Sequence, residues 1–157
     1  MTNRVDFDHI SSYSAPEESP GFLLWRTSTL WRRSLEVALK PYDLTHPQFV
    51  VLATVGWLTK EGQKTSQIAV SRLSGLDPNT VSQILRGLQA KGILVRSAPQ
   101  GGKRKTPLLT PEGVDRLSHA LPAVEQADAE FFSSLKREKQ DFLKGLRKLA
   151  YIDRGEL

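Results

Sequence analysis

The amino-acid sequence predicts a mainly α-helical protein with one small β-hairpin. Apolar residues recur at helical spacing through most of the chain, with capping residues and prolines at the starts of these segments. Two strand-like runs, "ILVRS" and "KTPLLT", flank a Pro- and Gly-containing tip, "APQGGKR". With 157 residues, the chain has the length of one domain, or of one domain with appended helices.

The chain begins with an arm and a first helix. Residues 1–20 include the Ser-, Pro- and Glu-rich stretch "SSYSAPEESP" and show no period, so we expect an arm that is flexible or docked on a partner. Residues 21–157 then form a single domain. Its first helix covers residues 21–40, where apolar residues recur at roughly helical spacing, and Pro41 ends it.

Three later helices have clear start signals. In "LTHPQFVVL", Thr45 and Gln48 have the spacing of a capping box. Asp77 caps "LDPNTV", where Pro78 takes the first helical position, and Thr110 caps "LTPEGV" in the same way. Pro and a capping side chain together predict where each helix begins.

A short helix precedes the one that starts at Pro78. The stretch "TSQIAVSRLSG" predicts a helix capped by Thr65, with Ile68, Ala69 and Leu73 as its apolar stripe and with a C-terminal glycine as its stop. A short helix, a tight turn containing glycine and a longer helix are typical of a helix-turn-helix. The hairpin that follows would then be a wing, and Pro107 places its second run at a sheet edge.

The terminal segments predict a dimer interface. Beyond residue 110 the chain is helical again, and Pro122 is expected to kink or split the first of these helices. We assign residues 44–110 to a DNA-binding lobe and residues 21–43 and 111–157 to dimerisation helices. Their apolar residues exceed what a small lobe can cover, which favours a homodimer: Leu23, Leu24, Leu30, Trp31, Phe131, Phe132, Leu135, Phe142, Leu143, Leu146 and Leu149.

Composition excludes several classes of function. The chain has no cysteine, so it forms no disulfide and has no thiolate metal ligand. The histidines His9, His46 and His119 show no metal-ligand or catalytic-triad spacing, so we expect neither an enzyme nor a metal or cofactor site. No apolar run approaches the roughly 20 residues of a membrane span, and the N-terminus lacks a signal peptide. We expect a cytoplasmic protein without a membrane partner.

The positive charge is concentrated in one segment. The chain has 22 basic and 17 acidic residues, a net charge of +5. From Pro78 to Pro111 there are 6 basic residues and no acidic one, so the remainder has 22 − 6 = 16 basic and 17 acidic residues, a net charge of −1. Such a segment indicates a polyanionic partner.

The polar face of the predicted helix from Pro78 to Lys91 suits a DNA groove. Its apolar residues have the spacing of one core-packed face, and the other face has hydroxyls, amides and one guanidinium, which bond to phosphates and base edges. The Gly-rich hairpin tip adds basic residues that suit a wing. The candidate DNA-binding residues are Pro78, Asn79, Thr80, Ser82, Gln83, Arg86, Lys103, Arg104 and Lys105.

This segment has two alternative interpretations. A phosphate-binding P-loop fails on spacing, because Ser97 and Arg104 stand where Gly and Ser or Thr are needed. A winged-helix module that binds RNA or a protein partner is the other alternative. Base stacking on RNA needs aromatic side chains, and residues 58–130 contain no Phe, Tyr or Trp, so double-stranded DNA is favoured.

The order of these motifs resembles the MarR family of winged-helix transcription regulators. The resemblance spans about residues 21–150 and rests on "LTHPQFVVLATV", "TSQIAVSRLSGLDPNTVSQILRGLQAKGILVRS" and "LLTPEGVDRL". It implies a homodimer that reads a pseudo-palindromic site, a recognition helix matching Pro78–Lys91 and a wing near the minor groove. It also implies, for many members, a small aromatic or anionic effector that weakens DNA binding.

The wing departs from the family pattern. The usual Asp and Arg pair aligns with Gly101 and Lys103, so either Lys103 or Arg104 enters the minor groove. Trp25, Trp31 and Trp57 either line an effector pocket or belong to the core and interface. The effector-binding residues stay unassigned from the sequence.

Overall fold

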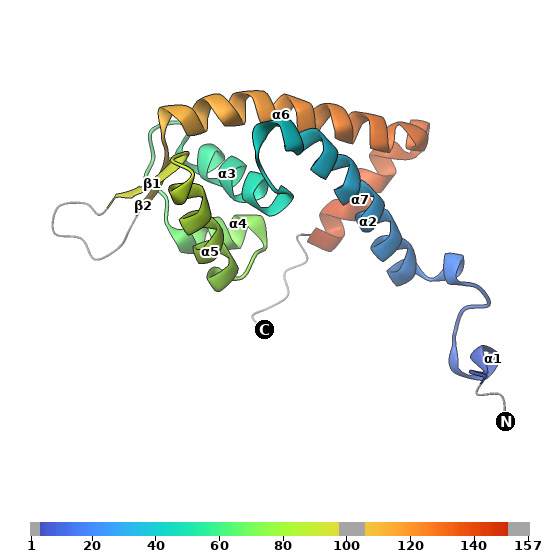
Figure 1. The fold of residues 1–157 in the computed structure, drawn as a ribbon. Coiled ribbons are helices and arrows are strands. Elements are labelled where there is room, and N and C mark those ends of the chain that lie inside the picture. Colours follow the sequence, from blue (N-terminus) through green and yellow to red (C-terminus); the bar gives the residue numbers. More distant parts are fainter. Residues whose placement is uncertain (1–3, 98–105, 151–157) are drawn as a thin grey trace.

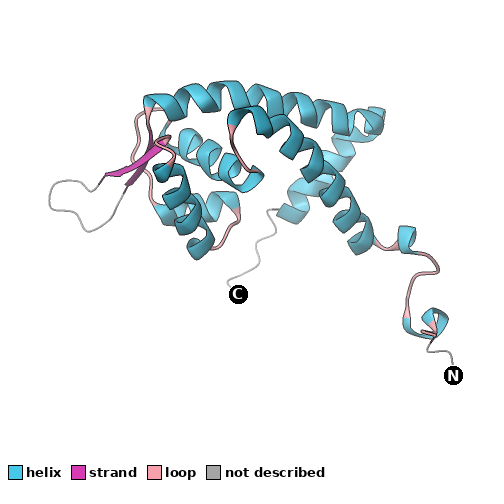
Figure 2. Ribbon diagram, viewed as in Figure 1, coloured by secondary structure: helices cyan, strands magenta, loops and turns pink. Residues whose placement is uncertain are grey.

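A computed structural model of the chain describes residues 4–97 and 106–150 (Figure 1). The described part is mainly helical, and its strands belong to one hairpin (Figure 2). The arm contains α1 (Phe7–Ile10) and η1 (Pro16–Glu18), and the domain follows with α2 (Pro20–Leu39), η2 (Lys40–Tyr42), α3 (His46–Thr59), α4 (Gln67–Ser74), α5 (Pro78–Ala90), β1 (Leu94–Ser97), β2 (Thr106–Leu109), α6 (Pro111–Phe131), η3 (Phe132–Glu138) and α7 (Lys139–Ala150).

The helices α2 and α6 pack along each other and form the scaffold (Figure 1). Helix α2 begins where Ser19 Oγ accepts the N–H of Phe22, and it ends before Pro41, close to the predicted limits. Trp31 Nε1 donates to Asp128 Oδ1 at 2.7 Å, which ties α2 to α6. Together these helices hold the lobe formed by α3, α4, α5 and the hairpin at one end and η3 and α7 at the other.

The prediction that Pro122 kinks or splits the helix is wrong for a split, because α6 runs from Pro111 to Phe131 without interruption. Pro122 itself is exposed, while Ala120 and Val124 on either side of it are buried in the core. Packing of these neighbours outweighs the loss of one backbone hydrogen bond at the proline.

Helix α3 lies at the centre of the core and packs against α2, α4, α5, α6 and β2. The predicted capping box is confirmed: Thr45 Oγ1 accepts the N–H of Gln48 at 3.3 Å, and Gln48 Oε1 accepts the N–H of Thr45 at 3.2 Å. Val51, Leu52 and Val55 are completely buried. The start of α3 therefore fixes the position of residues that form the core.

Helix α4 differs from its prediction in two details. Ser66, not Thr65, is the N-cap, since Ser66 Oγ accepts the N–H of Ala69 at 3.2 Å. Val70 faces the core, whereas Ile68 and Leu73 of the predicted stripe are exposed. A helix of two turns presents only a narrow face to the core, and the packing of α4 against α3 and α5 places Val70 on that face.

The β-hairpin is confirmed, and it packs tightly on the start of α6. Strand β1 pairs antiparallel with β2, and Arg96 lies opposite Pro107 at the predicted sheet edge. A Cβ atom at Gly113 would lie 1.9 Å from the carbonyl oxygen of Ile93, so only glycine fits there. Thr110 caps α6 as predicted and also donates to the carbonyl of Gly92 at 2.8 Å.

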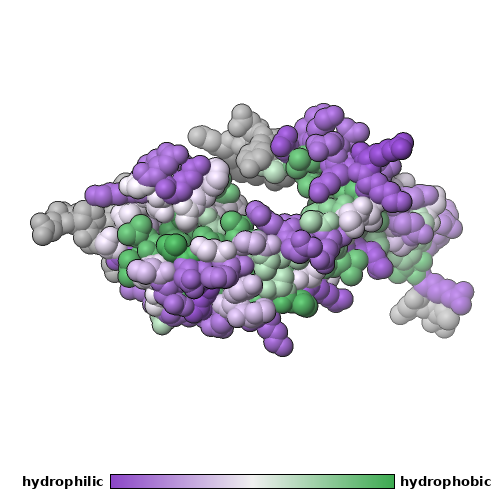
Figure 3. Space-filling view, turned by 90° about the horizontal axis from the view of Figure 1, so that it is seen from above, coloured by the Kyte–Doolittle hydropathy of each residue, from purple (hydrophilic) through white to green (hydrophobic). Residues whose placement is uncertain are grey.

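The terminal elements expose apolar surface. Helix α7 has no buried residue, and its Phe142, Leu143 and Leu149 are exposed. Figure 3 shows small hydrophobic areas among hydrophilic side chains at the end of the molecule away from the hairpin. The arm projects from the start of α2 (Figure 1). Within residues 4–97 and 106–150, no helix has both the length and the hydrophobicity needed to cross a membrane.

Candidate nucleic-acid interface

The start of α5 is fixed by Asp77. Its Oδ1 accepts the N–H groups of Asn79 and Thr80, each at 3.0 Å, and Pro78 fills the first helical position as predicted. The hydrogen bond from the Thr80 hydroxyl, followed by the backbone bonds, lowers the pKa of the Asp77 carboxyl below 3.8. The last acidic residue before the acid-free segment is thus a charged helix cap.

Helix α5 is amphipathic as predicted. Val81, Leu85 and Leu88 are completely buried against the core. Asn79, Gln83 and Arg86 are exposed, and their spacing aligns them in one row along the outer face. Thr80 and Ser82 flank this row and are half-buried.

The Thr80 hydroxyl has a role that sequence reasoning missed. Its Oγ1 donates to Asp77 Oδ2, so its proton is already committed to the cap. In this conformation the hydroxyl can accept a hydrogen bond but cannot donate one to a phosphate. Among the candidate DNA-binding residues, Asn79, Gln83 and Arg86 are therefore better placed to donate than Thr80.

Side chains of α4 position α5. Gln67 Nε2 donates to the carbonyl of Pro78 at 2.9 Å, and Ser71 Oγ donates to the carbonyl of Leu76 at 2.6 Å. Gly75 adopts a left-handed conformation, with φ of 72°, at the turn between the helices. These contacts hold the two helices in one geometry, which is how a helix-turn-helix presents its second helix.

The structure describes three basic residues of the acid-free segment, Arg86, Lys91 and Arg96, and two of them bind protein groups. Arg96 Nε donates to Gln89 Oε1 at 3.0 Å, which links β1 to α5. Lys91 Nζ bonds the carbonyl of Asp43 at 2.6 Å and its carboxylate at 3.0 Å. The wing candidates Lys103, Arg104 and Lys105 lie outside the described residues, so their contribution stays a prediction. Arg86 is the exposed basic residue on the outer row of α5.

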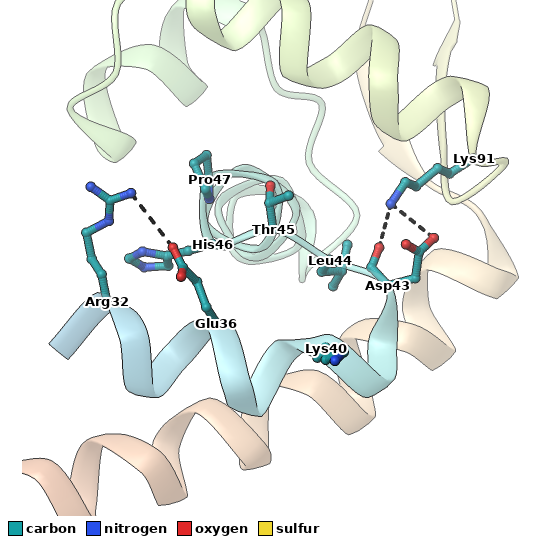
Figure 4. A pocket seen from close by; sticks show the side chains of 9 residues that line it. All are labelled: Arg32, Glu36, Lys40, Asp43, Leu44, Thr45, His46, Pro47 and Lys91. Carbon is teal, nitrogen blue, oxygen red and sulfur yellow. Dashed lines mark hydrogen bonds and ion pairs between the residues drawn. The ribbon is translucent and has the colours of Figure 1, made fainter. Parts of the chain in front are cut away.

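An open pocket of about 570 Å³ lies where α2, η2, α3 and the end of α5 meet (Figure 4). Figure 4 shows Arg32, Glu36 and His46 at one end of it and Lys91 with Asp43 at the other. Sequence reasoning missed this site, although Arg32 and Glu36 on α2 and Lys40 at the start of η2 recur every four residues. The pocket is lined by Arg32, Glu36, Lys40, Asp43, Leu44, Thr45, His46, Pro47 and Lys91.

The pocket has a cationic lining with two carboxylates. Arg32 Nη2 lies 3.9 Å from Glu36 Oε1, and because both side chains are exposed, the attraction between their charges is weak. Burial, followed by the Arg32 charge, lowers the pKa of His46 from 6.5, while Asp128 and Glu36 act in the opposite direction. The His46 ring packs edge-on against Trp31, with ring centroids 5.1 Å apart. A neutral imidazole and nearby cations suit an aromatic anion.

The three tryptophans and the other histidines are not part of this lining. Trp31 is half-buried and packs against His46, whereas Trp25 and Trp57 are exposed. Lys60 Nζ lies 3.5 Å from the centroid of the Trp57 ring. His9 pairs with Asp6 in the arm, and His119 is exposed on α6. No group of three potential metal ligands occurs among the residues that the structure describes.

The chain is similar to bacterial transcriptional regulators. It is 38% identical over 140 residues to the uncharacterized HTH-type transcriptional regulator YdcH of Bacillus subtilis, which covers 88% of this chain and 95% of that protein. It is 30% identical over 131 residues to the HTH-type transcriptional repressor Rv2887 of Mycobacterium tuberculosis, covering 82% of this chain and 91% of the repressor. No family model matches the chain.

Solved structures show the same fold. A MarR family transcriptional regulator from Rhodococcus sp. RHA1 superposes with a TM-score of 0.77 at 23% identity, covering 88% of this chain and 97% of that one. The MarR family protein Rv2887, in complex with salicylic acid, superposes with a TM-score of 0.63 at 28% identity, covering 83% and 96%.

Proposed function

The chain belongs to the MarR family of winged helix-turn-helix transcriptional regulators, and we propose that it binds operator DNA as a homodimer, with α5 in the major groove. The observation that carries this proposal is the outer row of α5. Asn79, Gln83 and Arg86 are exposed donors on a face without carboxylates, and the contacts from α4 hold that face in place. Side chains of these types read base edges, and a carboxylate would be repelled by phosphates.

The exposed apolar surface supports the homodimer. Leu24 on α2 is 60% exposed, and Leu149 on α7 is 66% exposed. The start of α2 and helix α7 both lie at the end of the molecule away from the lobe (Figure 1). Apolar side chains gathered on one region usually mark an interface with another chain. A second copy packed there would place two α5 helices on one face of the duplex, about one turn or roughly 34 to 36 Å apart.

Base-specific contacts are tested by removing the donors one at a time. DNA fragments that the purified protein selects from its own genome supply the specific site, and a random duplex supplies the reference. Arg86→Ala and Gln83→Ala should each weaken specific binding by about 1 to 3 kcal/mol and relax the preference at particular bases. Arg33→Ala, which removes an exposed guanidinium from α2, is the matched control. Equal losses on both duplexes would show that these residues contact only phosphates.

We also propose that a small aromatic carboxylate binds the pocket and controls DNA binding. The lining has three basic residues, and a relative with 30% identity is solved in complex with salicylic acid. Lys91 belongs both to this lining and to the C-terminal end of α5. A carboxylate that competes with Asp43 for Lys91 would alter how α5 is held, and so would weaken binding by both recognition helices.

Salicylate is the probe for this second proposal. Added salicylate should quench or shift tryptophan fluorescence through Trp31 and should release the protein from its selected DNA. Arg32→Gln and Lys40→Gln should each weaken the response to salicylate by about tenfold, the loss of one charge-assisted hydrogen bond. Arg33→Gln, on the same helix but outside the lining, should leave the response unchanged. If all three variants respond like the wild type, the pocket is not the effector site.

A further inference from the structure

The arm exposes apolar side chains that its own chain does not cover. Phe7 is 67% exposed and Ile10 is 71% exposed, and Val5 and Tyr13 are exposed as well. The arm contacts the rest of the chain mainly through η1 and α2, and it lies apart from the lobe (Figure 1). Its local shape is nevertheless defined, because Ser14 N–H donates to Glu18 Oε2 at 3.1 Å and His9 pairs with Asp6.

Helix α7 presents an unpartnered apolar stripe. Phe142, Leu143, Leu146 and Leu149 have the spacing of one helix face, and none of them is buried. The helix contacts the rest of the chain mainly through η3, and the ring centroids of Phe132 on η3 and Phe142 on α7 lie 5.7 Å apart. Its remaining apolar surface is available to another segment.

The arm and the α7 region have opposite charges. Residues 4–19 contain one basic residue and four acidic residues, Asp6, Asp8, Glu17 and Glu18, so their net charge is 1 − 4 = −3. Residues 132–150 contain six basic and two acidic residues, a net charge of 6 − 2 = +4. Lys139 and Arg147 stand four residues before and after Leu143, so they lie on the same side of α7 as the stripe. Asp6 and Asp8 are the sequence neighbours of Phe7 in the arm.

We propose that the arm of one copy docks along α7 of the second copy, with its apolar side chains on the Phe142–Leu149 stripe and its carboxylates beside Lys139 and Arg147. This inference rests on the proposed homodimer and extends it, because each arm then spans to the other chain. A contact within one chain is disfavoured, since the arm extends from α2 away from its own α7 in this structure (Figure 1). Matching apolar surfaces and opposite charges make the second copy the fitting occupant.

Cross-linking between single cysteines tests the arrangement, because the natural chain has no cysteine. Asp8→Cys and Arg147→Cys chains, carrying different tags, are co-expressed and treated with a short bis-maleimide. We expect a cross-linked product that contains both tags. Pairing Asp8→Cys with Lys60→Cys, an exposed position at the end of α3, is the matched control and should give at least tenfold less product. Equal yields from the two pairs would overturn the proposal.

A chain carrying both Asp8→Cys and Arg147→Cys separates the second copy from the other occupants. Cross-linking should give a product of two chains, and a product of one 17.5 kDa chain would show that the arm folds back on its own α7 instead. Sedimentation equilibrium of the untreated protein keeps the two proposals apart. A dimer without the arm–α7 product overturns only the docking of the arm, whereas a monomer overturns the homodimer itself.

Discussion

At the scale of single residues, His46 links protonation to the packing of α2, α3 and α6. Burial is the larger cause of its lowered pKa and the Arg32 charge the second, with Asp128 and Glu36 opposing them. The folded state therefore prefers the neutral ring, and the unfolded chain binds the proton first as the pH falls. The free energy of unfolding is highest above pH 6.5 and decreases as the pH falls through 6.5 toward the folded pKa.

We expect urea unfolding to show this loss between about pH 7.5 and about pH 5.5. His46→Gln should make the free energy of unfolding less dependent on pH over the same range, because no imidazole is then buried at the start of α3. His119→Gln, which removes an exposed histidine from α6, is the control and should leave the pH dependence of the free energy of unfolding unchanged. If His46→Gln keeps the wild-type dependence, another group causes it.

Residues whose role is set by their near neighbours were predictable from the sequence. The caps at Thr45, Asp77 and Thr110 are confirmed, because each bonds to backbone groups within the next turn. Partners distant in sequence were not predictable. Lys91 counted only as a positive charge, but in the structure it binds Asp43, 48 residues away, and becomes part of a pocket.

At the scale of elements, the close approach of α6 to Ile93, directly before β1, makes Gly113 a point where the wing and the scaffold depend on each other. Gly113→Ala would place a methyl group against the Ile93 carbonyl, so the backbone must shift. We expect a loss of about 1 to 3 kcal/mol in the free energy of unfolding, the usual cost of overpacking. Gly145→Ala on α7 meets open space and should instead stabilise by up to about 1 kcal/mol. Equal urea midpoints for the two variants would contradict the close packing of Gly113 on Ile93.

The wing should contribute affinity mainly through charge. Neutralising Lys103, Arg104 and Lys105 together should reduce the slope of log K against log salt by about 0.9 for each phosphate that the wing no longer neutralises. The measurement is DNA binding across a salt series, with Arg33→Ala as the control for removing a charge elsewhere on the protein. An unchanged slope in the triple variant would remove the wing from the interface.

Most elements were predictable because their apolar periodicity and their start signals agree. The exceptions are places where packing decides. Helix α4 is too short for its periodicity to identify Val70 as the inward residue, and the adjacent hydroxyls Thr65 and Ser66 are equally good caps in sequence. Helix α6 continues through Pro122 because the buried residues on either side of the proline pack on the core. The local sequence does not indicate this packing.

At the scale of the whole molecule, the scaffold of α2 and α6 connects two surfaces of different character. One end carries α5 and the hairpin, and the other carries the exposed apolar residues of α7 (Figure 1). Joining two copies at the apolar end would fix the spacing of their recognition helices. The sequence predicted both surfaces, but it could not show the pocket between them, since that pocket depends on how α2, α3 and α5 meet.

Methylation interference on a selected DNA fragment tests the central claim most directly, because guanine N7 lies in the major groove where α5 is expected to bind. We expect two symmetric clusters of interfering guanines, with centres about 10 to 10.5 base pairs apart, as two α5 helices of one dimer would give. Loss of interference within both clusters in the Arg86→Ala variant would assign them to this helix. A single cluster, or binding that no guanine methylation disturbs, would contradict major-groove reading by a homodimer.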